Sequence, residues 1–184
     1  MVIPKLIKKN KLFLIEWLAV ILNIGFTILF QQGNPWAFVM GVAGPLLLGY
    51  LSYQRKLLAD VLLQLAYCIL AIYGYYQFVT IPVMTESVFL HLLGALVSLG
   101  LGFVMGIYLK KKTSAALPML DSMITSFSLW ATLLLMSGFQ SAWLYFIVIN
   151  MVSVFLFYKR NLKVISLLFV LYAMLAIQGY FKLV

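Results

Sequence analysis

Seven long apolar runs constrain the fold of this chain more than any other feature of its sequence. They fall at residues 11–31, 36–54, 57–79, 87–109, 118–138, 141–158 and 161–182. One helix crosses a bilayer with about 20 apolar residues. Only 9% of the 184 residues are charged, whereas a soluble domain carries about 25%. The sequence therefore predicts an all-α integral membrane protein with seven transmembrane helices in one membrane domain over residues 1–184.

The residues outside these runs exclude several function classes. They leave no room for a fused ATPase, kinase or receptor domain. The single cysteine, Cys68, lies inside an apolar run and provides neither a disulfide framework nor a Cys/His metal spacing. The single histidine, His91, lies about one turn inside 87–109, with no second histidine beside it. We predict no enzyme activity, no cofactor and no metal site, and a packed or interfacial role for His91.

Basic residues lie almost entirely at one end of the expected helices. Twelve of the thirteen fall on the side of the N-terminus, and only Lys182 falls opposite. Because positive charge in short loops stays in the cytoplasm, this pattern predicts a cytoplasmic N-terminus and an extracytoplasmic C-terminus. The net charge of +9 is then a topology signal and does not indicate a nucleic-acid partner. The twelve are Lys5, Lys8, Lys9, Lys11, Arg55, Lys56, Lys110, Lys111, Lys112, Lys159, Arg160 and Lys163.

The four acidic residues lie near expected helix starts. Glu16, Asp60 and Asp121 fall in early turns of their runs, and Glu86 precedes 87–109. A helix N-terminus favours negative charge, although an acidic residue in a membrane helix can also form a cation or proton site. No charged residue lies near the expected midplane. This absence favours passive movement of an uncharged or charge-delocalised solute over ion-coupled transport.

An internal repeat relates the two ends of the chain. Residues 57–76 match residues 162–181 at an offset of 105, with nine of twenty positions identical, Gly74 with Gly179 among them. The same offset pairs Glu16 with Asp121, and an offset of 107 pairs Trp36 with Trp143. We predict two parallel three-helix repeats, at 11–79 and 118–182, joined by a linker helix at 87–109. In such transporters the substrate site lies near the midplane between the repeats.

Small residues mark two of the expected helices. Gly94, Ser98, Gly102 and Gly106 recur every four residues, which predicts close packing of the linker helix on a repeat or on another protomer. In the second helix Gly44-Pro45 predicts a kink, which serves either packing or as a hinge for alternating access.

Polar side chains near the midplane either join helices or line a ligand pocket. Trp143, Phe146 and Asn150 share one helical face, which suits a planar ring that stacks and also carries hydroxyl or amide groups. The polar set is Asn23, Gln64, Tyr67, Ser126, Ser128, Asn150 and Ser153.

Several motifs together resemble the Pnu family of bacterial vitamin transporters, which includes nicotinamide riboside transporters. They are Glu16-Trp17, Leu58-Ala59-Asp60 through Gln64 and Tyr67 to Tyr73-Gly74-Tyr75, Leu120-Asp121-Ser122, Trp143 to Asn150, and Tyr158-Lys159.

This resemblance implies a fold, a mechanism and a site. The fold would be a 3+1+3 arrangement related to the SWEET sugar transporters, assembled as a homotrimer in the bacterial plasma membrane. The activity would be facilitated diffusion of an unphosphorylated vitamin, which a cytoplasmic kinase traps afterwards without any implied binding between the two proteins. The substrate-binding residues would be Gln64, Tyr67, Trp143, Phe146 and Asn150, with Trp36 as a weaker candidate.

Three positions depart from nicotinamide riboside transporters, which typically carry Trp, Trp and Asp where this chain has Tyr75, Phe146 and Asn150. Nicotinamide riboside is the expected substrate, and thiamine, then riboflavin or a deoxynucleoside, are the alternatives. Two other classes stay open: a vitamin-binding subunit of an ATP-driven importer, and a structural membrane protein without a ligand.

Overall fold

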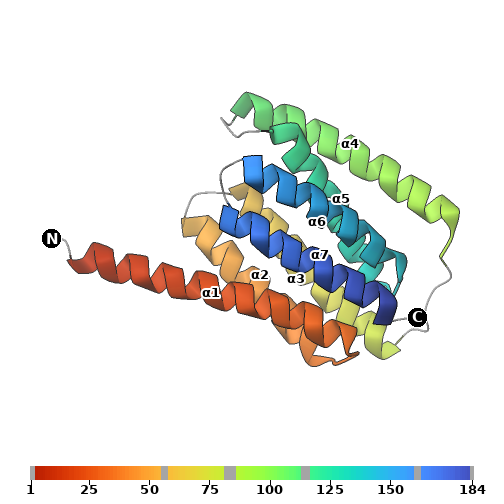
Figure 1. Cartoon of the computed structure of the whole chain (residues 1–184), viewed down its shortest axis with the longest axis horizontal. Coiled ribbons are helices and arrows are strands. Elements are labelled where there is room, and N and C mark those ends of the chain that lie inside the picture. Colours follow the sequence, from red (N-terminus) through yellow and green to blue (C-terminus); the bar gives the residue numbers. More distant parts are fainter. Residues whose placement is uncertain (1–2, 55–57, 81–85, 113–116, 160–162, 183–184) are drawn as a thin grey trace. The chain divides into compact units, whose positions relative to one another are not determined.

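The computed structural model describes residues 3–54, 58–80, 86–112, 117–159 and 163–182. Within these residues the chain forms seven helices, each long and apolar enough to cross a membrane (Figure 1). The predicted all-α fold with seven helices of membrane-spanning length is thus confirmed. The predicted loop charges Arg55, Lys56 and Arg160 lie outside the described residues. The helices are α1 (Ile3–Gln31), α2 (Trp36–Gln54), α3 (Leu58–Thr80), α4 (Val88–Lys112), α5 (Pro118–Met136), α6 (Ser141–Lys159) and α7 (Lys163–Lys182).

Several helix ends differ from the prediction, and three of these differences have a physical explanation. Helix α1 begins at Ile3 rather than at residue 11, because Leu6 and the lysines of this segment are good helix formers. Helix α4 continues to Lys112, where cationic side chains suit the negative end of the helix dipole. Helix α5 ends at Met136, two residues early, because the backbone turns at Gly138 with a φ of 81°.

The structure divides into two compact units, residues 1–81 and residues 82–184, and each is described by itself. In the first unit α2 packs against both α1 and α3 (Figure 1). Phe38 of α2 is buried, and its ring lies 5.9 Å from that of Phe30 in α1 and 5.6 Å from that of Phe78 in α3. Side-chain packing around Phe38 therefore joins all three helices.

Glycines on α2 bring its neighbours close. A Cβ on Gly41 would lie 2.9 Å from the ring of Phe26 in α1, and one on Gly44 would lie 2.9 Å from Oδ1 of Asn23. Helix α2 continues through the buried Pro45 to Gln54. The small residues beside Pro45 therefore serve the packing of α2 against α1.

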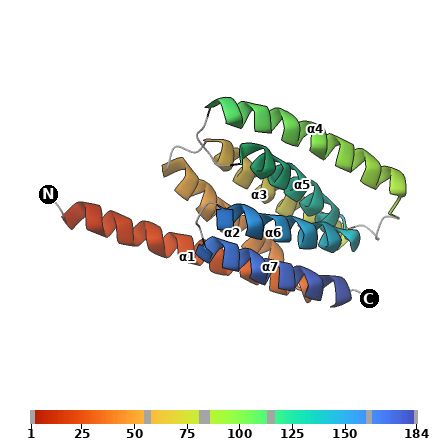
Figure 2. The same ribbon diagram turned by 45° about the horizontal axis from the view of Figure 1, so that its top comes forward.

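In the second unit α4 runs along α5 (Figure 2), and its buried small-residue face makes the contact. A Cβ on Gly94 would lie 2.1 Å from the ring of Trp130, and one on Gly106 would lie 2.5 Å from Sδ of Met119. Of the two predicted partners for this face, packing on a helix of the same chain is confirmed.

Helix α7 packs along α6 in the same unit. Ser166 Oγ donates a hydrogen bond of 2.9 Å to the carbonyl of Val154, and the rings of Phe157 and Phe169 stack at 5.0 Å. Gln140 Nε2 donates a hydrogen bond of 2.9 Å to the carbonyl of Tyr180 at the other end of α7.

The turn between α1 and α2 has the same hydrogen bonds as the turn between α5 and α6. Asn34 N–H donates to the carbonyl of Leu29, and Phe139 N–H donates to that of Leu134, both at 3.0 Å. Each turn contains a glycine with positive φ, 65° at position 33 and 81° at position 138. Equivalent residues of the two turns are 105 positions apart in the sequence.

The register of these turns corrects the predicted pairing of Trp36 with Trp143. Phe38 N–H donates to the carbonyl of Pro35, and Trp143 N–H donates to that of Gln140. Phe38 and Trp143 are both buried, whereas Trp36 is exposed. The structural counterpart of Trp143 is therefore Phe38, at the offset of 105 that the rest of the repeat follows.

Candidate functional site

Three of the predicted site residues lie together on α6. Trp143 is 2% exposed and Asn150 is 8% exposed, and Phe146 lies between them, partly buried. The ring centroids of Trp143 and Phe146 are 6.4 Å apart with an interplanar angle of 55°. The two rings are thus inclined to one another, on the helical face that also carries the amide of Asn150.

The amide of Asn150 differs from the other polar groups of this unit. Ser153 Oγ donates to the carbonyl of Ile149, and Ser126 Oγ donates to that of Met123, each within its own helix. The side chain of Asn150 makes no hydrogen bond within the described part of the chain. The amide of Asn150 therefore stays a candidate for hydrogen bonding to a ligand.

Trp143 is held from one side by α7. A Cβ on Gly179 would lie 2.7 to 2.8 Å from three atoms of the indole ring, closer than side chains approach one another. Only glycine fits at this position while the ring stays where it is.

Two further predicted residues lie on α3 in the first unit. Gln64 is 8% exposed, and Tyr67, one turn further along the helix, is partly buried. Gln64 Nε2 donates a hydrogen bond of 3.4 Å to Oδ1 of Asp60, and Ser52 Oγ of α2 donates to Oδ2 of the same carboxylate. Gln64 is thus a buried amide that a carboxylate orients.

Trp36, the weaker candidate, is the first residue of α2. Its backbone N–H donates a hydrogen bond of 3.0 Å to Oδ1 of Asn34, and its side chain is 68% exposed. Trp36 therefore contributes to the start of α2 through its backbone, while its ring lies on the surface.

The structure brings the predicted residues together in two groups. Trp143, Phe146 and Asn150 share a face of α6, and Gln64 and Tyr67 share a face of α3. That all of them line one pocket stays a prediction. Asn23, another predicted polar residue, donates to the carbonyl of Ala19 in its own helix at 2.9 Å and packs beside Gly44.

An apolar groove of about 490 Å³ runs between α5 and α6. None of the six predicted site residues lines it. Tyr145 and Val148 of the lining lie on the face of α6 opposite Trp143 and Asn150. The lining residues are Leu120, Met123, Ile124, Phe127, Leu144, Tyr145, Val148, Ile149 and Val152.

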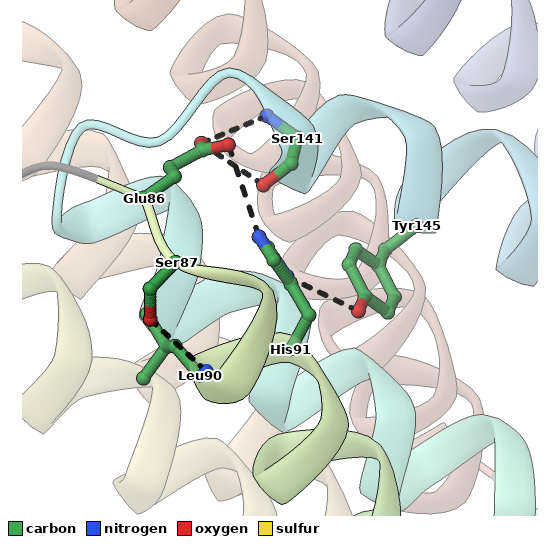
Figure 3. A network of polar contacts seen from close by, with 6 residues as sticks. All are labelled: Glu86, Ser87, Leu90, His91, Ser141 and Tyr145. Carbon is green, nitrogen blue, oxygen red and sulfur yellow. Dashed lines mark hydrogen bonds and ion pairs between the residues drawn. The ribbon is translucent and has the colours of Figure 1, made fainter.

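A polar network links α4 to the start of α6 (Figure 3). Oε1 of Glu86 accepts hydrogen bonds from N–H and Oγ of Ser141, at 3.3 and 3.0 Å. His91 Nε2 lies 3.8 Å from Oε2 of Glu86, and its Nδ1 lies 3.3 Å from the hydroxyl of Tyr145. The rings of His91 and Tyr145 also stack at 6.0 Å. The side chain of His91, on α4, thus packs against α6, which agrees with the predicted packing role.

Sequence analysis did not connect two residues with the site. Asp60 was interpreted either as a helix-end charge or as a cation or proton site, although its spacing of four residues from Gln64 places both on one face of α3. Gly179 was recognised in the repeat, but its contact with Trp143 is tertiary, and only the structure reveals it.

Comparisons with known proteins agree with this architecture. The sequence profile of the family described as "Nicotinamide mononucleotide transporter" matches residues 13–183. The fold is similar to a solved structure, "Crystal structure of the Vitamin B3 transporter PnuC", with a TM-score of 0.71 and 21% identity over 91% of this chain and 79% of that one. Among curated proteins none matches the chain.

Seven membrane-length helices and a transporter profile over nearly the whole sequence define a multi-pass membrane transporter. Within that class, the chain belongs to the nicotinamide mononucleotide transporter family.

Proposed function

We propose that this transporter carries an unphosphorylated vitamin, nicotinamide riboside, across the membrane by facilitated diffusion. The site is formed by Gln64 and Tyr67 of α3 and by Trp143, Phe146 and Asn150 of α6, with Trp36 as a peripheral contact. The supporting observation is the amide of Asn150, a largely buried residue that shares a helical face with two aromatic rings and makes no hydrogen bond within the described residues.

The residue chemistry suits a nucleoside better than a nucleotide. Aromatic rings attract a flat cationic pyridinium by stacking and by cation–π interaction. The amides of Gln64 and Asn150 donate and accept hydrogen bonds, as ribose hydroxyls and a carboxamide require. A phosphate is bound preferentially by Arg or Lys, and none of the six residues is basic. The riboside is therefore favoured over the mononucleotide in the family description.

The proposed mechanism uses two parallel repeats, 11–79 and 118–182, joined by a linker helix over 87–109. The matching turns at positions 29–38 and 134–143 support this arrangement. Four helices, α1 to α4, precede α5. Helix α5 would therefore start on the same side of the membrane as α1, and equivalent helices would cross in the same direction. Rocking of the repeats around the bound vitamin would then expose it to each side in turn.

The proposed setting is the bacterial plasma membrane. Twelve of the thirteen basic residues support a cytoplasmic N-terminus and an extracytoplasmic C-terminus. We also propose a homotrimer, and a cytoplasmic kinase that phosphorylates the entering vitamin and so keeps uptake favourable without an ion gradient.

A second candidate substrate is thiamine. It is favoured by Tyr75, Phe146 and Asn150, at which nicotinamide riboside transporters typically carry Trp, Trp and Asp. The smaller ring at position 146 and the neutral amide at position 150 would change which ring and which polar group the site accepts. Riboflavin and deoxynucleosides are further candidate substrates, ranked after thiamine.

Uptake by proteoliposomes tests the proposal. The purified chain in liposomes should equilibrate labelled nicotinamide riboside with neither ATP nor an ion gradient, and excess unlabelled riboside inside should accelerate entry of the label. Thiamine and nicotinamide mononucleotide serve as competitors. An ATP requirement, or tight binding without transport, would instead identify a binding subunit of an ATP-driven importer.

A further inference from the structure

Asp60 accepts hydrogen bonds from two buried side chains on two helices. Ser52 Oγ of α2 donates to Oδ2, and Gln64 Nε2, one turn along α3, donates to Oδ1 at 3.4 Å. Ser52 and Gln64 are both more than nine-tenths buried. An ionised carboxylate has no hydrogen to donate, so it can face only the NH₂ end of a Gln amide.

This contact determines which atom of Gln64 remains available. With Nε2 directed to Asp60, the carbonyl oxygen Oε1 is the free end of the amide, and it accepts no hydrogen bond within the described residues. The stem of the side chain packs near Gly49, where an added Cβ would lie 3.4 Å from Cβ of Gln64. The side chain is thus restrained at its stem and at one end of its amide.

We infer that Asp60 is a positioning residue, which fixes Gln64 so that the site presents a hydrogen-bond acceptor to its ligand. The inference rests on the proposed function, since it concerns how the same site recognises the vitamin. The ligand group opposite Gln64 must then be a donor, a hydroxyl or an N–H. Ribose hydroxyls and the carboxamide of nicotinamide riboside meet this requirement, whereas a carboxylate or an ether oxygen does not.

Exchanging the carboxylate of Asp60 and the amide of Gln64 tests whether Gln64 presents an acceptor to the ligand. D60N removes the acceptor-only partner, so Gln64 can present either end, and the affinity for nicotinamide riboside should fall about tenfold, the effect of losing one charge-assisted hydrogen bond. Q64E places two carboxylates against each other and should lower the affinity further. In D60N/Q64E the amide of position 60 donates to the carboxylate of position 64, which still presents an acceptor to the ligand.

The double variant should therefore bind nicotinamide riboside within about threefold of wild type, a coupling that independent sites do not show. Affinity is measured by Trp fluorescence, and thermal melting is recorded for every variant. D121N is the matched control, because it removes an acidic residue from the first turn of α5 and should leave affinity unchanged.

Two outcomes would overturn the inference. One is a double variant whose loss of affinity for nicotinamide riboside equals the combined losses of the two single variants. This would mean that Gln64 acts as a donor or does not touch the ligand. The other is wild-type affinity in D60N and in Q64E. If the wild-type chain itself binds neither nicotinamide riboside nor thiamine, the proposed function fails first, and that result is distinct from both.

Discussion

Gly179 of α7 lies against the indole ring of Trp143 so closely that no larger residue fits between the helices without displacing the ring. Within the second unit, the position of Trp143 therefore depends on position 179 having no side chain. The candidate ligand-binding residue and the residue that sets its position come from different helices of one unit.

Gly179→Ala should weaken vitamin binding without unfolding the protein. The added methyl group would have to displace the ring of Trp143, since 2.7 Å is far below a normal carbon–carbon contact. We expect the affinity for nicotinamide riboside to fall about tenfold, which corresponds to about 1.4 kcal/mol. Trp fluorescence titration measures it. Gly100→Ala is the matched control, because nothing lies within 4 Å of its added Cβ.

Asn150→Ala should abolish binding while the fold persists. The amide makes no hydrogen bond within the described residues, so its removal deprives the ligand and not the protein of a partner. The melting temperature of the variant should equal or exceed that of wild type. Ser153→Ala on the same helix should bind normally, because the Ser153 hydroxyl donates to the carbonyl of Ile149 within its own helix. Normal binding by the Asn150 variant would remove α6 from the site.

Gly94→Ala should destabilise the second unit. A Cβ at this position would lie 2.1 Å from the ring of Trp130, so α4 would have to move away from α5. Overpacking of this kind costs about 1–3 kcal/mol. Thermal melting in detergent measures the loss, and Ala at position 100 of the same helix should instead leave stability unchanged or raise it. Equal melting temperatures for both variants would contradict the packing described here.

Gly33→Ala and Gly138→Ala should cost similar amounts of stability. Both glycines have positive φ, and neither has an atom within 4 Å of an added Cβ, so backbone strain alone sets the cost. A left-handed conformation costs a non-glycine residue about 1–2 kcal/mol. Asn at either position should cost less than Ala, because Asn tolerates this conformation better. Unequal costs would count against the equivalence of the two turns.

Glu86→Ala should lower stability and leave binding affinity intact. The carboxylate accepts hydrogen bonds at the first turn of α6 and faces His91 of α4. Loss of such an N-terminal partner typically costs about 1 kcal/mol. Melting temperature and riboside titration separate the two effects. His91→Phe keeps a ring beside Tyr145 and should cost less.

Much of the fold could be predicted from the sequence because long apolar runs and turn residues are local signals. The start of α2 at Trp36 and the start of α6 at Ser141 agree with the predicted runs. The pairing of Trp36 with Trp143 was wrong because matching residue types were preferred over the constant offset of the repeat. Phe38 occupies the buried position that corresponds to Trp143. Because Phe and Trp are different residue types, this correspondence was harder to recognise in the sequence.

The candidate site was less predictable, for a physical reason. The common face of Trp143, Phe146 and Asn150 follows from helical spacing alone. The contact of Ser52 with Asp60 and that of Gly179 with Trp143 depend on which helices are neighbours, and periodicity does not contain this information.

The match between the turns at Gly33 and Gly138 gives α4 a topological role under the parallel-repeat proposal. A chain that has crossed a membrane three times ends on the far side, so a second copy of the same unit cannot follow directly in the same orientation. One additional crossing must return the chain to its starting side. Helix α4 would make that return, and it alone among the seven has no counterpart at the offset of 105. Under this proposal a substitution on α4 has no equivalent position in either repeat that would have to change with it.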